Sequence, residues 1–275
     1  FTITALCLCT ALAVGAKKSK VKERQNPFMT EYKTPFNIPP FEQITYADYV
    51  PAVKEGIAQH NADIDAIIKR RDRPDFENTI LALDNAGALL TKVSYVFFAL
   101  SESDGTPEMD EIAAEITPLI TAHSDEVSMN PLLFQKVKEV YDNKKIYNLT
   151  RAQERLLDKT YKSFVNNGAL LSEAEKEELK QINQEISAAQ LEFNKNLQKE
   201  NNTTEVVVED AAELSGLPES TIAEAASQAA ARGKEGKWVF TVHAPSRLAV
   251  LTYADSRDLR ERMYKAYMTI GAKDN

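Results

Sequence analysis

Apolar residues recur along most of this chain at intervals of three and four, which is the spacing of one face of an α-helix. In the first such stretch Asp48 is placed to cap a helix, and Pro51 falls in the first turn, where its missing N–H has no helical partner. The pattern predicts an amphipathic helix whose apolar face carries Val50, Val53, Ile57, Ile64, Ile67 and Ile68.

A second apolar stretch begins at Asp75 or Asn78, either of which can cap a helix. We interpret it as one buried helix. Gly87 lies on the apolar stripe, so we expect another helix to approach closely there, because glycine otherwise costs about 1 kcal/mol relative to alanine inside a helix. The stripe consists of Ile80, Leu83, Gly87, Leu90, Val93, Phe97 and Leu100.

Four further helices are predicted from their caps. Thr106 and Asn130 each precede a proline, Thr150 precedes a third helix, and Ser172 opens the capping box SEAE of the longest one. This last helix is expected to reach residue 199 and to span roughly 40 Å at 1.5 Å per residue. Its narrow stripe predicts packing on one side, through Leu179, Ile182, Ile186, Ala189, Phe193 and Leu197.

The pattern of residue types changes after residue 200, where β-branched residues favour strands. We predict a mainly α, multi-helix fold with a small β element near 204–209 and 237–242. A turn at Gly216 leads into an alanine-rich helix between the two strands. The predicted divisions are an extended arm at 17–45, an N-terminal helical domain at 46–200 and a small mixed segment at 201–275.

Residues 1–16 are predicted to be a secretory signal peptide, because an apolar run ends in small residues at Val14–Ala16 and meets lysines at once. The run is shorter than the about 20 residues of a spanning helix, which disfavours an uncleaved anchor. Lipid attachment at Cys7 or Cys9 is a minor alternative, since leucine precedes each cysteine. We therefore expect a periplasmic or secreted protein without stable membrane insertion after cleavage.

Charge and cysteine content exclude several kinds of site. The formal net charge is −8 and the basic residues are scattered, which argues against a nucleic-acid surface. Both cysteines lie inside the predicted leader, so the mature part has no thiol for a disulfide or a thiolate metal site.

The candidate metal ligands are the three histidines, His60, His123 and His243. Neither HNADI nor HSDEV has a second histidine that would place two imidazoles on one helix face. A zinc site assembled from distant residues stays open, but capping, surface or hydrogen-bonded histidines are the simpler interpretation. No catalytic, cofactor-binding or metal-binding residue is assigned within the chain.

Two other groups have a structural and a functional interpretation. The glutamates at 173–178 crowd the start of a solvated helix, which explains them better than acid–base catalysis does. Aromatic residues near the end could line a ligand surface, but at helical and strand spacing they favour the core; they are Trp238, Tyr253, Tyr264 and Tyr267.

Three stretches in order carry a resemblance: FENTILALDNAG at 76–87, NNGALLSEAEKEEL at 166–179 and APSRLAVLTYADSRDLRERMYKAY at 244–267. With them the chain resembles the N-terminal portion of the thimet-oligopeptidase-like zinc metallopeptidases, which include peptidyl-dipeptidase and oligopeptidase A. The resemblance covers nearly all of the mature chain and leans toward the peptidyl-dipeptidase branch, although Ile270 stands where many members have arginine.

The resemblance implies a helical fold that encloses a channel between two halves, and hydrolysis of short peptides with one zinc ion. In the family the zinc lies on a later helix with the motif HExxH, so its ligands are expected beyond residue 275. Residues 201–275 would then include the start of a truncated catalytic half. The fragment alone is expected to be inactive, and the whole protein is expected to be a monomer that binds short peptides.

A second hypothesis is a stand-alone helical binding or interaction protein that lacks catalysis. The lack of an initial methionine and the end at GAKDN favour an incomplete chain over this alternative. Dipeptide release and endopeptidase cleavage both stay open, because the residues that would bind the substrate terminus are not in this sequence.

Overall fold

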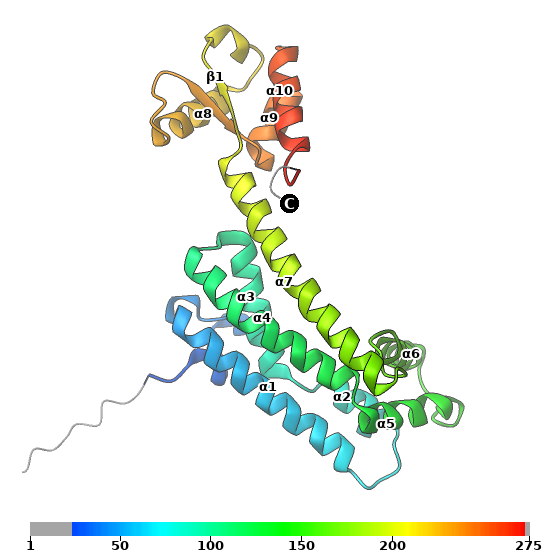
Figure 1. Cartoon of the computed structure of the whole chain (residues 1–275). Coiled ribbons are helices and arrows are strands. Elements are labelled where there is room, and N and C mark those ends of the chain that lie inside the picture. The colour runs from blue at the N-terminus through cyan, green and yellow to red at the C-terminus, as the bar shows by residue number, and fades with distance from the viewer. Residues whose placement is uncertain (1–23, 273–275) are drawn as a thin grey trace, which may run out of the picture.

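A computed structural model of the chain describes residues 24–272. The mainly α prediction is confirmed: most of the described residues are helical, and their strands form one small antiparallel sheet. The predicted leader at 1–16 lies outside the described residues. In Figure 1 a helical part, residues 24–203, carries a smaller mixed part, residues 204–272, at the far end of its longest helix.

Residues 24–45 are less extended than the proline content suggested. They contain three one-turn 3-10 helices, at Pro27–Met29, Pro35–Asn37 and Phe41–Gln43, and the first two begin with proline, whose fixed φ angle suits the start of a turn. Phe28 is fully buried and packs on Tyr49, with ring centroids 5.3 Å apart. Phe28 therefore belongs to the core of the helical part, whereas most of the segment is exposed.

Helix α1, Tyr46–Lys69, has its N-cap three residues earlier than predicted. Thr45 is the N-cap, and Asp48 completes a capping box by accepting the Thr45 N–H at 2.7 Å. Pro51 consequently lies inside the helix rather than in its first turn. Arg24 donates two hydrogen bonds to the buried Asp48 carboxylate, at 2.7 and 2.8 Å, and thereby holds its pKa below the usual value.

The predicted second helix is broken. Asp75 caps a π-helical turn, Phe76–Leu81, which is followed by the short α2, Ala82–Asp84, and then by α3, Ala88–Asp104. The break occurs at Gly87, where φ is +70°. Residues 76–104 are apolar enough to resemble a membrane span by length and composition, and within this range the helix breaks at Gly87 while Val93 and Phe97 are buried in the core of the helical part.

The other predicted helices begin at their predicted caps. They are α4, Pro107–Ser128; α5, Pro131–Asp142; α6, Arg151–Asn166; and α7, Glu173–Thr203. Each cap side chain accepts a backbone N–H of the first turn, which satisfies donors that have no partner inside the helix.

The predicted buried stripe of α7 is wrong. Ile182, Ile186 and Phe193 are 43%, 48% and 48% exposed, because α7 meets α4 through a different face. On that face Thr121 and Ser187 share a hydrogen bond of 2.8 Å, and Leu191 packs against the apolar cluster of α1, α3 and α4. Within the described residues, the face of α7 that carries Ile182, Ile186 and Phe193 is therefore not covered by another element.

The helical part has two apolar clusters. One lies among α1, α3 and α4 and includes Val53, Phe97 and Ile116, all fully buried. The other lies around α5 and α6 and includes Leu133 and Leu157. Because α3 packs against α1 in the first cluster, the position of α3 depends on that core.

The mixed part contains β1, Glu205–Val208, and β2, Trp238–Thr241, which confirms the small β element. The strands are antiparallel, with Val206 opposite Phe240. Three helices pack around the sheet and a separate apolar cluster: α8, Glu219–Ala231; α9, Ala244–Tyr253; and α10, Arg257–Met268.

Candidate functional site

The structure brings His60 and His123 together, although they are far apart in the sequence. His60 comes from α1 and His123 from α4, and the His60 Nδ1 and His123 Nε2 atoms are 2.9 Å apart. The rings meet edge to face with centroids 4.9 Å apart. Sequence reasoning treated each histidine separately, because no local spacing connects them.

The histidine pair is packed tightly. His123 is 4% exposed, and its Nδ1 has no hydrogen-bond partner within the described residues. A Cβ at Gly87 would lie 2.8 Å from the His60 ring, so only glycine allows this approach. The close approach predicted at Gly87 therefore occurs, and the nearby Asp63 carboxylate accepts the Gly87 N–H at 3.1 Å.

Burial lowers the pKa of both histidines. The cause for His60 is mainly desolvation, opposed by the charge of Asp63. For His123 it is desolvation together with the charge of His60, opposed by Glu126. Both rings are therefore favoured in their neutral forms, with one N–H shared between them.

Residues 24–272 do not fit a catalytic zinc site. Within this range no three His, Cys, Asp or Glu side chains converge. The two paired histidines are hydrogen-bonded to each other, whereas a catalytic zinc takes three protein ligands and a water.

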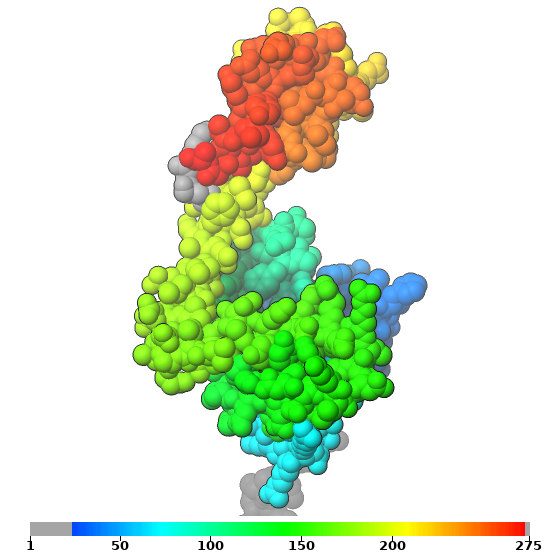
Figure 2. Space-filling view, turned by 90° about the vertical axis from the view of Figure 1, so that its right-hand side faces the viewer, coloured from blue at the N-terminus to red at the C-terminus, as the bar shows by residue number. Residues whose placement is uncertain are grey.

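The third histidine, His243, lies in a polar hollow between the two parts of the molecule. The hollow has a volume of about 530 Å³ and is lined by Glu102–Gly105 at the end of α3, by Gln198 and Asn201–Asn202 of α7, and by Val242–Ala244 and Arg247. Figure 2 shows this side of the molecule hollowed between α3 and the C-terminal part.

The polar hollow continues along α3. A groove lined by α3, α4 and α7 shares Glu102, Gln198 and Asn201 with it. A further hollow on α3 shares Phe98 and Glu102 with that groove and includes Tyr95, which is 76% exposed. These hollows together form a continuous surface tract, which we call the α3 tract.

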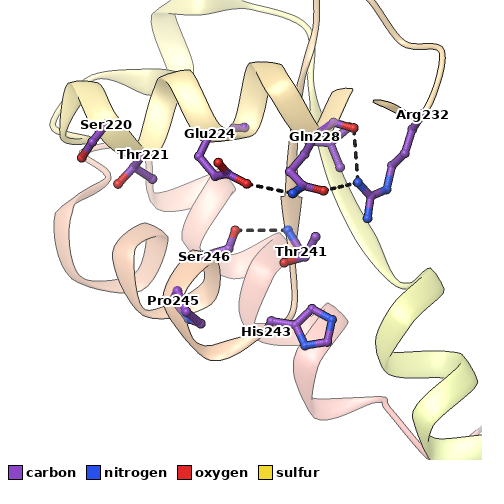
Figure 3. A pocket seen from close by; sticks show the side chains of 11 residues that line it. Ser220, Thr221, Glu224, Gln228, Arg232, Thr241, His243, Pro245 and Ser246 are labelled. Carbon is purple, nitrogen blue, oxygen red and sulfur yellow. Dashed lines mark hydrogen bonds between the residues drawn. The ribbon is translucent and has the colours of Figure 1, made fainter. Parts of the chain in front are cut away.

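A second groove lies on the other side of His243, between α8, β2 and α9 (Figure 3). Its volume is also about 530 Å³. Its polar groups are mostly committed to one another: Gln228 donates to Glu224 at 2.8 Å, and the Thr241 N–H donates to Ser246 Oγ at 3.1 Å. The polar hollow, by contrast, has lining amides that form no hydrogen bond within the described residues.

The other sequence candidates lie outside these hollows. Glu175 accepts from Ser172 in the capping box, which lowers its pKa, and Lys176 lowers that of Glu173. Glu173 and Glu175 are both exposed, as expected for glutamates at the start of a solvated helix. Tyr253, Tyr264 and Tyr267 are 54%, 54% and 41% exposed, so the expectation of core tyrosines is wrong; only Trp238 packs against the mixed core.

Known proteins similar to this chain are peptidases. Over 250 residues it is 33% identical to dipeptidyl carboxypeptidase of Escherichia coli, a match that covers 91% of this chain and 37% of that protein. It is 31% identical to dipeptidyl carboxypeptidase of Salmonella typhimurium over 248 residues, covering 90% of this chain and 36% of that protein. For oligopeptidase A of Salmonella typhimurium the identity is 29% over 244 residues, which cover 89% of this chain and 35% of that protein.

No family model matches the chain. The chain spans little more than a third of the length of these curated relatives. Over about nine-tenths of its own length the chain is a homologue of proteins named dipeptidyl carboxypeptidase and oligopeptidase A.

Proposed function

We propose that this chain is part of a longer zinc metallopeptidase that hydrolyses short peptides. The observation that supports this is the match to dipeptidyl carboxypeptidase, 33% identical over 250 residues. We further propose that the protein is exported to the periplasm or secreted and that it acts as a monomer, with peptidyl-dipeptidase or oligopeptidase activity.

The residues described here would contribute to binding rather than to bond cleavage. The α3 tract offers amide and carboxylate groups from Gln198, Asn201 and Glu102 beside the apolar Phe98. Such a surface can hydrogen-bond an extended peptide backbone and accept apolar side chains. A folded protein could not present its backbone to these groups, which would favour short unstructured substrates.

The zinc ligands would lie beyond residue 275, since the described residues do not fit a metal site. The purified 275-residue chain is then expected to hold no stoichiometric zinc after dialysis and to cleave no peptide. Stoichiometric, chelator-sensitive zinc in this chain would contradict the assignment.

The reading frame beyond codon 275 provides the decisive test. We expect it to continue for several hundred residues and to encode HExxH on a helix. The longer polypeptide should cleave short peptides, lose this activity with a zinc chelator, and spare intact globular proteins. An immediate stop codon in an intact gene would overturn the peptidase proposal and favour the stand-alone binding protein.

A further inference from the structure

Arg247 is unlike the other half-buried arginines of the described chain. Arg260 donates to the backbone carbonyls of Ala254 and Asp255, and Arg262 pairs with the Glu213 and Asp258 carboxylates. Arg247 forms no ion pair within residues 24–272, and its one hydrogen bond, to the Val242 carbonyl, is long at 3.4 Å. Most of the five N–H donors of its guanidinium are therefore available.

The Arg247 side chain is nevertheless held in place. Its guanidinium carbon lies 3.6 Å from the centroid of the Tyr267 ring, so helix α10 provides a flat support for a side chain of α9. A guanidinium that stacks on an aromatic ring loses little further freedom when it binds a ligand, and its planar fork matches a carboxylate. The geometry is that of a prepared anion receptor.

The surroundings of Arg247 suit the end of a peptide. It lines the polar hollow together with the Gln198, Asn201 and Asn202 amides, which can hydrogen-bond peptide N–H and C=O groups. The opposite wall carries Glu102 and Asp104. These carboxylates repel a second anion, so the hollow favours a ligand whose negative charge is confined to the end near Arg247.

We propose that Arg247, supported by Tyr267, binds the carboxylate of a peptide that occupies the polar hollow. That the ligand is a peptide rests on the proposed function. The new element is that this chain recognises a carboxylate group of that peptide. The carboxylate can come from the C-terminus of the peptide or from an acidic side chain, and the test separates these two sources.

The test measures binding to the purified 275-residue chain by amide chemical-shift changes. The probes are N-acetyl tetra-alanine with a free carboxylate, its C-terminal amide, and the amide with one alanine replaced by glutamate. We expect the free acid to bind about tenfold or more tightly than the amide, because a charge-assisted bidentate contact is lost on amidation. Recovery of binding by the glutamate peptide would identify side-chain carboxylates as an additional source.

The protein variants are Arg247→Met, Arg247→Lys and the control Arg257→Met, which removes an exposed arginine outside the hollow. Arg247→Met should abolish the preference for the free acid, Arg247→Lys should retain part of it, and Arg257→Met should leave it unchanged. Tyr267→Phe should preserve the preference and Tyr267→Leu should weaken it severalfold, because only the ring supports the guanidinium.

Equal binding of acid and amide to the wild-type chain would overturn the proposal without any variant needing to fold. So would an absence of binding by both probes, or an equal loss in Arg247→Met and Arg257→Met. None of these results bears on hydrolysis by the longer polypeptide, which is measured separately, so failure of one proposal can be told from failure of the other.

Discussion

Helix α4 packs on α1 and on α7, and it meets these two neighbours with different chemistry. Toward α1 it presents buried apolar residues such as Ile116 and the buried His123. Toward α7 its contacts are polar: Asn183 donates to Asp125 at 2.7 Å and Gln184 donates to the Pro118 carbonyl at 3.2 Å. The contact between α1 and α4 is stabilised by apolar surface area that is removed from water. Each polar contact between α4 and α7 replaces hydrogen bonds to water with a hydrogen bond inside the protein, so its net contribution to stability is only about 1 kcal/mol.

The difference has a structural consequence. The α1–α4 contact also includes α3, so the α3 wall of the polar hollow is anchored in an apolar cluster. Helix α7 carries the mixed part, with Arg247, at its far end (Figure 1) and contacts α4 through hydrogen-bonded polar groups. The two walls of the hollow are thus held by contacts of different chemistry.

The largest effect should come from a matched pair of phenylalanine truncations. Phe97→Ala removes a fully buried ring of the α1–α3–α4 core and should destabilise the protein by about 3–5 kcal/mol. Phe193→Ala on the uncovered face of α7 removes a ring that is 48% exposed and should cost less than about 1 kcal/mol. Denaturant unfolding measures both values, and similar losses would contradict the contrast between a covered and an uncovered apolar face.

Asn183→Ala should destabilise the α4–α7 seam by about 1–2 kcal/mol at neutral pH, because it removes a donor from the buried Asp125 carboxylate. Burial raises the pKa of Asp125, and the Asn183 hydrogen bond opposes that shift. Once Asp125 is protonated it no longer needs the donor, so the loss should shrink in acid. Asn194→Ala, at an exposed position of the same helix, is the control. A loss that is independent of pH would contradict the role of Asp125.

The histidine pair predicts acid sensitivity of the α1–α4 seam. The pKa values of His60 and His123 are lowered from the ordinary value of 6.5. Below pH 6.5 the unfolded chain therefore binds more protons than the folded chain. The free energy of unfolding should fall as the pH drops below 6.5, and above that pH the histidine pair should cause no loss of stability. The expected loss is on the order of 1 kcal/mol, since His60 is only partly buried.

Thermal unfolding between pH 5 and 8 measures this loss. His123→Leu should flatten the pH dependence because the seam then has no buried imidazole pair. His243→Gln removes the exposed third histidine and should leave the dependence intact. An unchanged slope in His123→Leu would show that other groups control the acid response.

The smallest effect is expected from Ile186→Gln on the uncovered edge of α7. Ile186 is 48% exposed and glutamine is a good helix former, so the free energy of unfolding should change by less than about 0.5 kcal/mol. A loss above about 1 kcal/mol, or a change of oligomeric state in size-exclusion chromatography with light scattering, would mean that a partner covers this edge.

The sequence by itself determined the starts of α4, α5, α6 and α7 and the two strands, whereas the cap of α1 is Thr45 rather than Asp48. A cap such as Thr150 or Ser172 acts on N–H groups within three residues, so the information is local, and both helices begin where their caps predict. The two strands were also predicted from local composition, and they pair as expected.

Only the tertiary structure decided which apolar stripes are covered and which polar groups meet. The His60 ring of α1 packs against Gly87, where the helix breaks, and sequence periodicity contains no sign of this contact. The apolar face of α7 is exposed because α4 forms its hydrogen bonds with a different face of α7. Sequence periodicity does not show which of the two faces packs on a neighbouring helix. His60 with His123, and Arg247 with the residues of α3 and α7, are brought together across long stretches of chain. Such contacts depend on how helices pack, and no local propensity encodes that arrangement.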